Sequence, residues 1–137
     1  MAQKSKNKNN NRIPATSDVP ISFSFRFYDG ADRKYCISQW EKEKIALSLT
    51  RLKQINEKTY NEMAKDGVTM HFHQVDWAKT KKPKGFPNGA KEVGNPFQFE
   101  LLGINSGKAR VYGALNSAVF HIVWFDFNHE IWPTFRT

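Results

Sequence analysis

The sequence predicts an α+β fold: a mainly antiparallel sheet of about four to five strands with two helices packed on one face. Apolar and polar residues alternate over 21–28, 97–101 and 109–124, which is typical of strands with one buried face. Between the first two of these segments, apolar residues recur at helical spacing, at Ile45, Leu49, Leu52 and Ile55. The expected order is strand, helix, helix and then four strands, and the short final connections favour antiparallel neighbours.

The first strand is expected at 21–28, where the chain reads ISFSFRFY. Strict alternation directs four apolar side chains to the core and leaves Arg26 facing solvent. The core-facing residues are Ile21, Phe23, Phe25 and Phe27.

Two capping boxes predict where the helices begin. Ser38-Gln39-Trp40-Glu41 has the S-x-x-E form, so the first helix is expected at 39–56. Thr59-Tyr60-Asn61-Glu62 has the same form and predicts a short second helix, which ends at Asp66-Gly67 because glycine suits the left-handed residue after a helix.

A second strand is expected at 68–75, with Met70 and Phe72 on one face and His71 and His73 on the other. Two imidazoles on one strand face are a common start for a zinc site. The sequence places no third ligand beside His71 and His73. We therefore interpret them as polar residues on one strand face and predict no metal site.

The segment 76–96 has no clear period, and a loop of this length is typical of a binding loop or a mobile segment. It is rich in lysine, and the candidate nucleic-acid-binding residues are Lys79, Lys81, Lys82 and Lys84, with Trp77 and the outward-facing Arg26. Aromatic residues among lysines suit stacking on unpaired bases. Trp77 and Phe86 could equally hold the loop to the domain.

The final hairpin carries the densest group of functional side chains. After a turn at Asn105-Ser106-Gly107, a two-residue loop at Asn116-Ser117 would join two strands of about eight residues. That register pairs Tyr112 with His121 and Arg110 with Val123, which places Arg110, Tyr112 and His121 on one face. The opposite, core-facing set is Val111, Phe120, Ile122 and Trp124.

These residues suggest metal-independent cleavage of RNA. Such an enzyme needs a base for the 2′-hydroxyl, an acid for the leaving oxygen and a cation for the developing phosphate charge. Arg110 could grip phosphate, Tyr112 could donate a proton or stack on a base, and His121 or His129 could act as base or acid. His121 could instead be a half-buried residue between cross-strand neighbours, and His129 a surface residue.

The composition agrees with a nucleic-acid partner, because the formal net charge is +8. Half of this charge, +4, lies in the first twelve residues. They belong to a basic tail at 1–18 that is expected to be disordered, before a single domain at 19–137. The lone Cys36 excludes an internal disulfide and a cysteine-based zinc cage. Neither a signal peptide nor a run of about 18 apolar residues is present, so a cytoplasmic protein without membrane contact is expected.

The element order and the closing hairpin resemble the RelE/ParE superfamily of small bacterial toxins, including its HigB-like branch. The resemblance lies in Arg110-Val111-Tyr112-Gly113, the apolar strand 119–125 and His129-Glu130-Ile131-Trp132. The same C-terminal pattern is similar to a set of uncharacterised bacterial and phage-borne proteins. The resemblance implies a RelE-like fold, an mRNA-cleaving activity that often acts on the ribosome, no cofactor, and a protein antitoxin as partner. The long loop and the missing final helix depart from that family.

The leading hypothesis is therefore a RelE-like, RNA-binding toxin that cleaves mRNA without metal. The alternative is a non-catalytic module that binds nucleic acid or a protein partner in a defence, toxin–antitoxin or mobile-element system. An enzyme should lose activity but keep binding when His121 or His129 is replaced. A binding module should respond mainly to loss of Arg110 or of the loop lysines.

Overall fold

The computed structural model describes residues 18–65 and 70–133. The expected tail, apart from Asp18, lies outside the described residues. The predicted helix end at Asp66-Gly67 and the first two positions of the predicted second strand, 68–69, also lie outside them.

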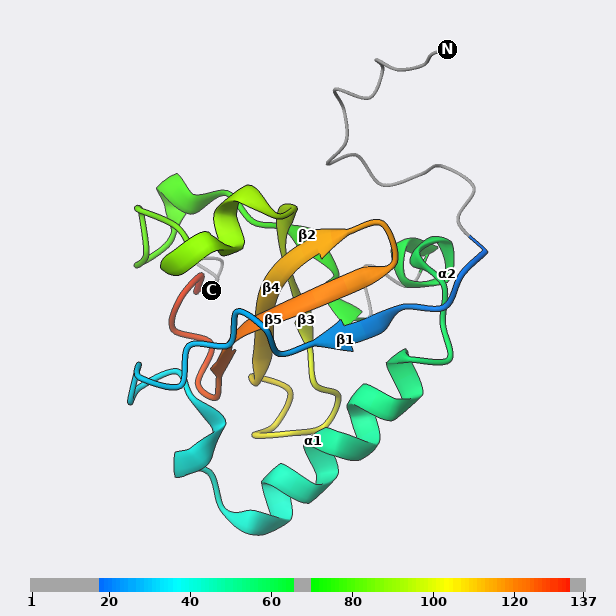
Figure 1. Ribbon diagram of the computed structural model, residues 1–137. Coiled ribbons are helices and arrows are strands. Elements are labelled where there is room, and N and C mark those ends of the chain that lie inside the picture. Colours follow the sequence, from blue (N-terminus) through cyan, green and yellow to red (C-terminus); the bar gives the residue numbers. More distant parts are fainter. Residues whose placement is uncertain (1–17, 66–69, 134–137) are drawn as a thin grey trace.

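The described strands form one five-stranded sheet in the order β1-β5-β4-β3-β2 (Figure 1). β1 runs parallel to β5, and the other neighbouring pairs are antiparallel. The strands are β1 (Ser22–Ser24), β2 (His73–Gln74), β3 (Asn95–Glu100), β4 (Arg110–Asn116) and β5 (Val119–Asp126). The α+β class and the predicted order of elements are confirmed.

Helices α1 (Lys42–Ile55) and α2 (Tyr60–Lys65) cover one face of this sheet. Their buried side chains pack on aromatic residues of β3 and β5, and the cluster includes Leu52, Ile55, Met63, Phe99 and Phe120. Removing these apolar surfaces from water supplies most of the driving force for joining the two layers.

Only one of the two predicted capping boxes forms. The Thr59 amide donates to Glu62 Oε1 at 2.9 Å, and the Glu62 amide donates to Thr59 Oγ1 at 3.2 Å. The first box does not form, because Ile37–Gln39 is a separate 3₁₀ turn and α1 begins only at Lys42, with no side-chain cap. Residues 38–41 have the S-x-x-E spacing of a capping box, but α1 begins three residues later than predicted.

The predicted first strand is shortened to Ser22–Ser24, and its alternation does not continue. The chain turns after β1, where the Tyr28 amide donates to the Phe25 carbonyl at 3.0 Å. Phe25 is consequently 52% exposed, and Phe27 packs on the opposite side of the sheet from Phe23. Placing all four apolar residues of this segment in one core was wrong.

The long basic segment covers the second face of the sheet. It contains the short 3₁₀ helices η3 (Trp77–Lys79) and η4 (Asn88–Glu92), and its residues Phe86 and Ala90 are buried against this face. Side chains of β4 and β5 complete this second core, among them Tyr112, Ala114, Val123 and Trp124. The sheet is therefore enclosed between helices on one side and an ordered loop on the other.

The β4–β5 hairpin differs from the predicted register by a shifted turn and a bulge. Asn116 pairs with Val119, so the loop is Ser117-Ala118, and Ser117 has φ 55°. Further along, Gly113 pairs with Ile122 but Tyr112 pairs with Trp124, which leaves Val123 as the extra residue.

The bulge moves Trp124 to the face that carries Tyr112, whereas Val111, Phe120 and Ile122 keep the predicted helix-facing orientation. Gly113 allows the close approach, because a Cβ there would collide with the Phe120 ring and the His121 carbonyl. Arg110, Tyr112 and His121 do share the second face, as predicted, although none of the predicted cross-strand pairs forms.

Among residues 18–65 and 70–133, no helix is both long enough and apolar enough to span a bilayer.

Candidate active site

Polar side chains form two rows across the second face, at the end of the sheet where β3 finishes and β4 begins. The register aligns His73 with Gln98, Tyr112 and Trp124 in one row. The next row aligns Glu100 with Arg110 and Asp126. We call the polar cluster the set His71, His73, Gln98, Glu100, Arg110, Tyr112, Asp126 and His129.

Arg110 lies between two carboxylates in the second row and is buried, with 4% exposure. Its Nη1 donates to the carbonyls of Gly107 at 2.7 Å and Ala109 at 3.3 Å. Burial lowers the pKa of the guanidinium, while Glu100 and Asp126 act against that shift. Arg110 remains charged, because an arginine pKa starts above 12. Arg110 therefore provides a fixed positive charge in the buried part of the polar cluster.

Glu100 connects this buried charge to the surface. It is 8% exposed, and its Oε1 lies 3.5 Å from Nε2 of His71, whose side chain is 44% exposed. The ring centroids of His71 and His73 are 6.1 Å apart, so both imidazoles lie at the rim of the cluster. A carboxylate and an accessible imidazole in contact can exchange a proton with a ligand.

Asp126 organises the turn that follows β5. Its Oδ1 accepts from the Glu130 amide at 2.9 Å and its Oδ2 accepts from the Ile131 amide at 2.7 Å. Burial raises the pKa of Asp126 against the effect of these two bonds. The turn holds His129 at φ 58°, and His71 has φ 55°, so both histidines occupy the left-handed region that non-glycine residues enter at a cost.

His129 lies beside the cationic part of the cluster. Burial lowers its pKa to about 4, and the charges of Arg110 and His71 act in the same direction. The pKa of His73 is also lowered, first by burial and then by His71 and Arg110. His129 is therefore neutral at pH 7, the form that suits a base rather than a general acid, which is the other of the two roles predicted for it.

Tyr112 is completely buried, with 0% exposure. Burial and the nearby Asp126 carboxylate raise its pKa far above the ordinary tyrosine value. The phenol therefore stays neutral and cannot stack on an RNA base, which corrects one of its predicted roles. Its hydroxyl remains able to donate a hydrogen bond within the cluster.

His121 is separated from Arg110 along the sheet. It pairs with Ala114, four residues along β4 from Arg110, which is about 13 Å at the usual strand rise. It packs on Phe27 with a centroid distance of 5.5 Å, and its pKa is lowered by burial and then by Arg26. The structure thus brings Arg110, Tyr112 and His129 together and places His121 about 13 Å along the sheet from Arg110.

Two of the predicted nucleic-acid-binding residues, Trp77 and Lys82, make contacts within the fold. Trp77 packs on Phe86 and Trp124, with centroid distances of 4.9 and 6.2 Å, so it holds the loop to the sheet. Lys82 Nζ lies 3.0 Å from Asp32 Oδ2 and 4.8 Å from the Trp124 ring centroid. Trp77 thus agrees with the alternative prediction that it holds the loop to the domain, and Lys82 is paired within the fold.

The remaining predicted contacts are exposed: Lys79, Lys81 and Lys84 on the loop, and Arg26 beside His121.

Several buried polar atoms of the cluster lack a hydrogen-bonding partner among the described residues. They are Gln98 Oε1, Arg110 Nε, Tyr112 Oη and His129 Nε2. The only other such atom in the described chain is His121 Nδ1. Each buried polar group of this kind needs a partner, which water or a bound ligand can supply.

Sequence reasoning missed Gln98 and Glu100 as site residues. A signal existed: both alternate with Phe97 and Phe99, so they face away from the helices. Pairing the two strands through the predicted turn at Asn105-Ser106-Gly107 would have placed Glu100 opposite Tyr112, on the same face as its observed partner Arg110 and two residues from it.

Within the described residues, no group of three or more histidine, cysteine, aspartate or glutamate side chains is arranged to hold a metal ion. Comparisons of this chain with protein-family models, with curated proteins and with solved structures found no match. The polar cluster is therefore interpreted from its own geometry.

Proposed function

We propose that this protein binds RNA and cleaves it without a metal ion, with the polar cluster as its active site. The observation that carries the proposal is the contact between Glu100 and the accessible His71 above the buried charge of Arg110. These three groups are the base, the acid and the cation that such a reaction requires.

The proposed reaction is an internal transfer of a phosphodiester. Glu100 takes the 2′-hydroxyl proton, the 2′-oxygen forms a bond to phosphorus, and the bond from phosphorus to the 5′-oxygen breaks. His71 donates a proton to the leaving 5′-oxygen, so the products are a 2′,3′-cyclic phosphate and a free 5′-hydroxyl. From its buried position, Arg110 stabilises the negative charge that develops on the phosphate.

Burial changes the role first predicted for Arg110. Its guanidinium, at 4% exposure, cannot clamp an RNA phosphate from the surface in the described conformation. A buried cation still stabilises nearby negative charge strongly, because little water screens it. His129 and Tyr112 are neutral and transfer no proton in this scheme.

The proposed setting is that of a RelE-like toxin in the cytoplasm, acting on mRNA and controlled by a protein antitoxin. The family resemblance supports this setting, and the exposed Lys79, Lys81 and Lys84 support attraction of a polyanion.

The alternative is a non-catalytic binding module. It is favoured by the two bonds from Arg110 to the carbonyls of Gly107 and Ala109, which tie the β3–β4 loop in place. In that case the buried charges would be structural, and only the surface lysines and histidines would meet the partner.

The test compares Glu100→Gln and His71→Asn with His121→Asn on a short RNA in the presence of EDTA. We expect each of the first two variants to lose about 100-fold or more in cleavage rate, the usual contribution of a proton-transfer group. The control should retain activity, because His121 lies outside the cluster. An RNA with a single 2′-deoxy nucleotide at the cut should resist cleavage.

Binding of the same RNA, followed by fluorescence anisotropy, separates the two functions. Binding with no cleavage by the wild type would favour the binding module. Cleavage that persists in Glu100→Gln and His71→Asn would remove the polar cluster as the active site.

A further inference from the structure

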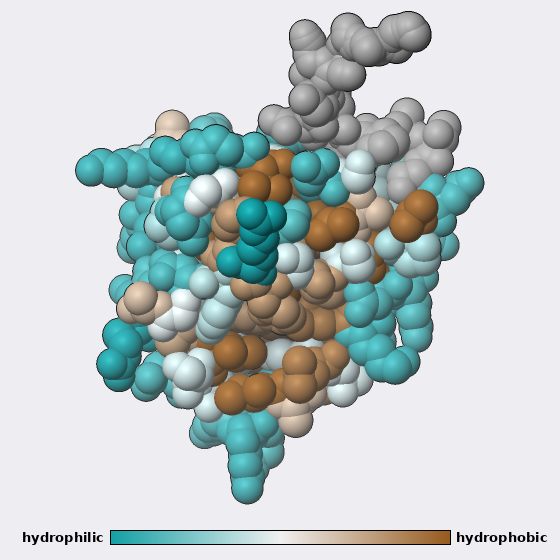
Figure 2. All heavy atoms as spheres, viewed as in Figure 1, coloured by the Kyte–Doolittle hydropathy of each residue, from teal (hydrophilic) through white to brown (hydrophobic). Residues whose placement is uncertain are grey.

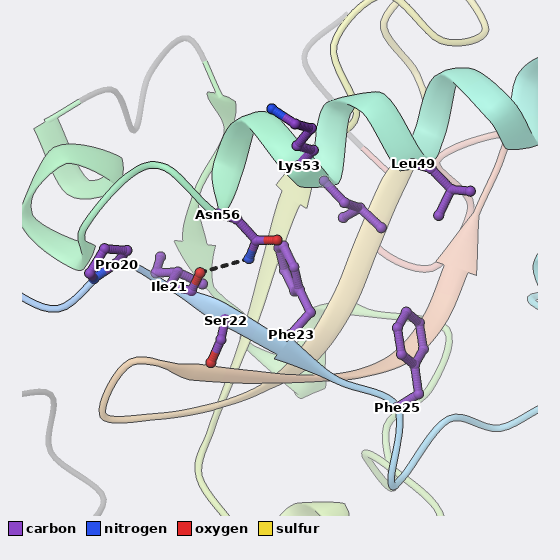
Figure 3. Close-up of a pocket in the computed structure, with 9 residues that line it drawn as sticks. Pro20, Ile21, Ser22, Phe23, Phe25, Leu49, Lys53 and Asn56 are labelled. Atoms are coloured by element: carbon purple, nitrogen blue, oxygen red, sulfur yellow. Dashed lines mark hydrogen bonds between the residues drawn. The ribbon is translucent and has the colours of Figure 1, made fainter.

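Two hollows lie beside α1, and they differ in their polar groups. The first, a groove of about 530 Å³ between β1 and α1, is mainly apolar, and Figure 2 shows apolar side chains over the middle of this face. Asn56 Nδ2 donates to the Ile21 carbonyl at 2.7 Å, as Figure 3 shows, and Lys53 pairs with Glu57. The amide and the lysine of this groove are thus both engaged within the fold.

The second hollow is a pocket of about 480 Å³ at the point where the chain enters α1. Part of its lining comes from residues between 34 and 44, and the rest comes from Phe127 and Asn128 in the turn after β5. Figure 1 shows these two segments next to each other, the first in cyan and the second in red. A volume of this size is typical of a site for a small ligand or a single nucleotide.

Aromatic rings form one part of this lining. Trp40 and Phe127 meet edge to face with ring centroids 4.8 Å apart, and both side chains are partly exposed. Proteins that bind single-stranded RNA use such rings as surfaces for unstacked bases. The net charge of +8 draws a polyanion toward the chain.

Two exposed polar side chains of the pocket have no partner among the described residues. Glu41 belongs to the predicted capping box that does not form, and its carboxylate makes no bond at the start of α1. The Gln39 side chain likewise forms no hydrogen bond within the described chain. A carboxylate accepts hydrogen bonds and an amide can donate them, so together they can read the edge of a ring-shaped ligand.

We propose that this pocket binds a guanine base of the RNA, close to the bond that the polar cluster cleaves, an inference that rests on the function proposed above. The pairing edge of guanine carries two adjacent donors, N1–H and N2–H, beside the acceptor O6. Glu41 accepts from both donors, and Gln39 donates to O6. The base lies against Trp40 and Phe127.

The carboxylate selects guanine over other occupants. Adenine, cytosine and uracil each offer a single donor group on the same edge, so none of them fills both oxygens of Glu41. A phosphate group or an acidic peptide is repelled by Glu41. A base edge with two donors is therefore the best match for this position.

The chain itself connects the pocket to the polar cluster. Asn128 lines the pocket, and the next residue, His129, belongs to the cluster. Consecutive Cα atoms are about 3.8 Å apart. Lys34, also in the lining, contacts Glu130 of the same turn at 3.1 Å. A base in the pocket therefore belongs to a nucleotide near the scissile phosphate.

The test measures binding of 2′-O-methyl oligonucleotides by fluorescence anisotropy. They cannot be cleaved by the proposed route, because the attacking 2′-oxygen is blocked. Each is a short strand of uracils with one central guanine, 7-deazaguanine, hypoxanthine or adenine. We expect guanine and 7-deazaguanine to bind equally, and about tenfold or more tighter than adenine, as one bidentate contact provides. Hypoxanthine should fall between them, because it lacks the N2 amino group.

The protein side is tested with Glu41→Gln and its charge-matched control Glu43→Gln, an exposed position on α1 outside the pocket lining. Both variants remove one negative charge, so they should bind the adenine strand equally. We expect Glu41→Gln to reduce the preference for guanine over adenine to less than about threefold, because the bidentate contact is lost. Glu43→Gln should keep the wild-type preference.

Three outcomes would overturn the guanine site. They are equal binding of the four strands, a guanine preference that survives in Glu41→Gln, and guanosine 5′-monophosphate that binds more tightly than the guanine strand. The last result would identify a free nucleotide as the ligand instead of RNA.

Cleavage assays separate this inference from the proposed function. Cleavage that depends on Glu100 but shows no preference for guanine near the cut would overturn the guanine site alone. Guanine-selective binding that Glu41→Gln abolishes, in a protein that cleaves no RNA, would support the guanine site and refute only the nuclease activity.

Discussion

At the scale of single residues, the pKa of His129 makes stability depend on pH. Its pKa is about 4 in the folded chain, against about 6.5 for an unperturbed histidine. Between these values the unfolded chain binds the proton more tightly than the folded one. This group's contribution is therefore fully present above about pH 6.5 and is lost as pH falls toward 4.

We expect the wild type to lose about 1 to 2 kcal/mol of unfolding free energy from this group between pH 7 and pH 4.5, because solvent partly screens a half-buried imidazole. His129→Asn should lack that part of the loss, because asparagine does not titrate and tolerates the left-handed backbone at φ 58°. Urea unfolding of both proteins at the two pH values measures it. Equal losses in the two proteins would show that His129 is not held in its neutral form.

At the scale of elements, the ordered loop over the second face depends on a few aromatic contacts. Trp77 packs edge-on against Phe86 and Trp124 and is only partly exposed. We expect Trp77→Ala to cost about 2 to 3 kcal/mol, below the usual range for a fully buried tryptophan. Amide hydrogen exchange at Gly85 and Phe86 should become faster, because both residues would lose their contact with the Trp77 ring.

Lys84→Ala is the control for the loop, since Lys84 is exposed in the same segment. It should leave both stability and exchange near wild-type values. A Trp77→Ala protein with unchanged exchange at Gly85 and Phe86 would mean that the loop is held mainly by Lys82 and its contacts with Asp32 and Trp124.

At the scale of the whole molecule, the charge distribution predicts how salt affects RNA binding. Each phosphate neutralised on a single strand contributes about 0.7 to the slope of log affinity against log salt. Replacing the three exposed loop lysines by glutamine should therefore reduce that slope by about 2. The lysines are Lys79, Lys81 and Lys84.

The matched control removes the same charge from the helices, by replacing Lys42, Lys44 and Lys65 with glutamine. It should weaken binding only slightly and leave the slope nearly unchanged. Fluorescence anisotropy of a labelled single-stranded RNA between 50 and 200 mM KCl gives both slopes. Equal slopes for the two triple variants would place the RNA away from the loop.

Local sequence patterns predicted most elements of this fold but not where each begins. The alternation at 97–101 and the capping box at Thr59-Glu62 are confirmed, because short-range sterics and hydrogen bonds decide them. The alternation at 21–28 failed after Ser24, since the turn at Phe25 carries the chain across to the other face of the sheet.

By itself, the sequence determined the α+β class, the order of the elements and the shared face of Arg110, Tyr112 and His121. Periodicity is a local property, so it can be read without knowing the neighbours of each strand. Only the tertiary structure decided the bulge at Val123, the loop over the second face, the meeting of Glu100 with Arg110 and the separation of His121. Each of these depends on strand register and on packing between distant segments, because cross-strand alignment and burial are set by contacts that no single stretch of sequence contains.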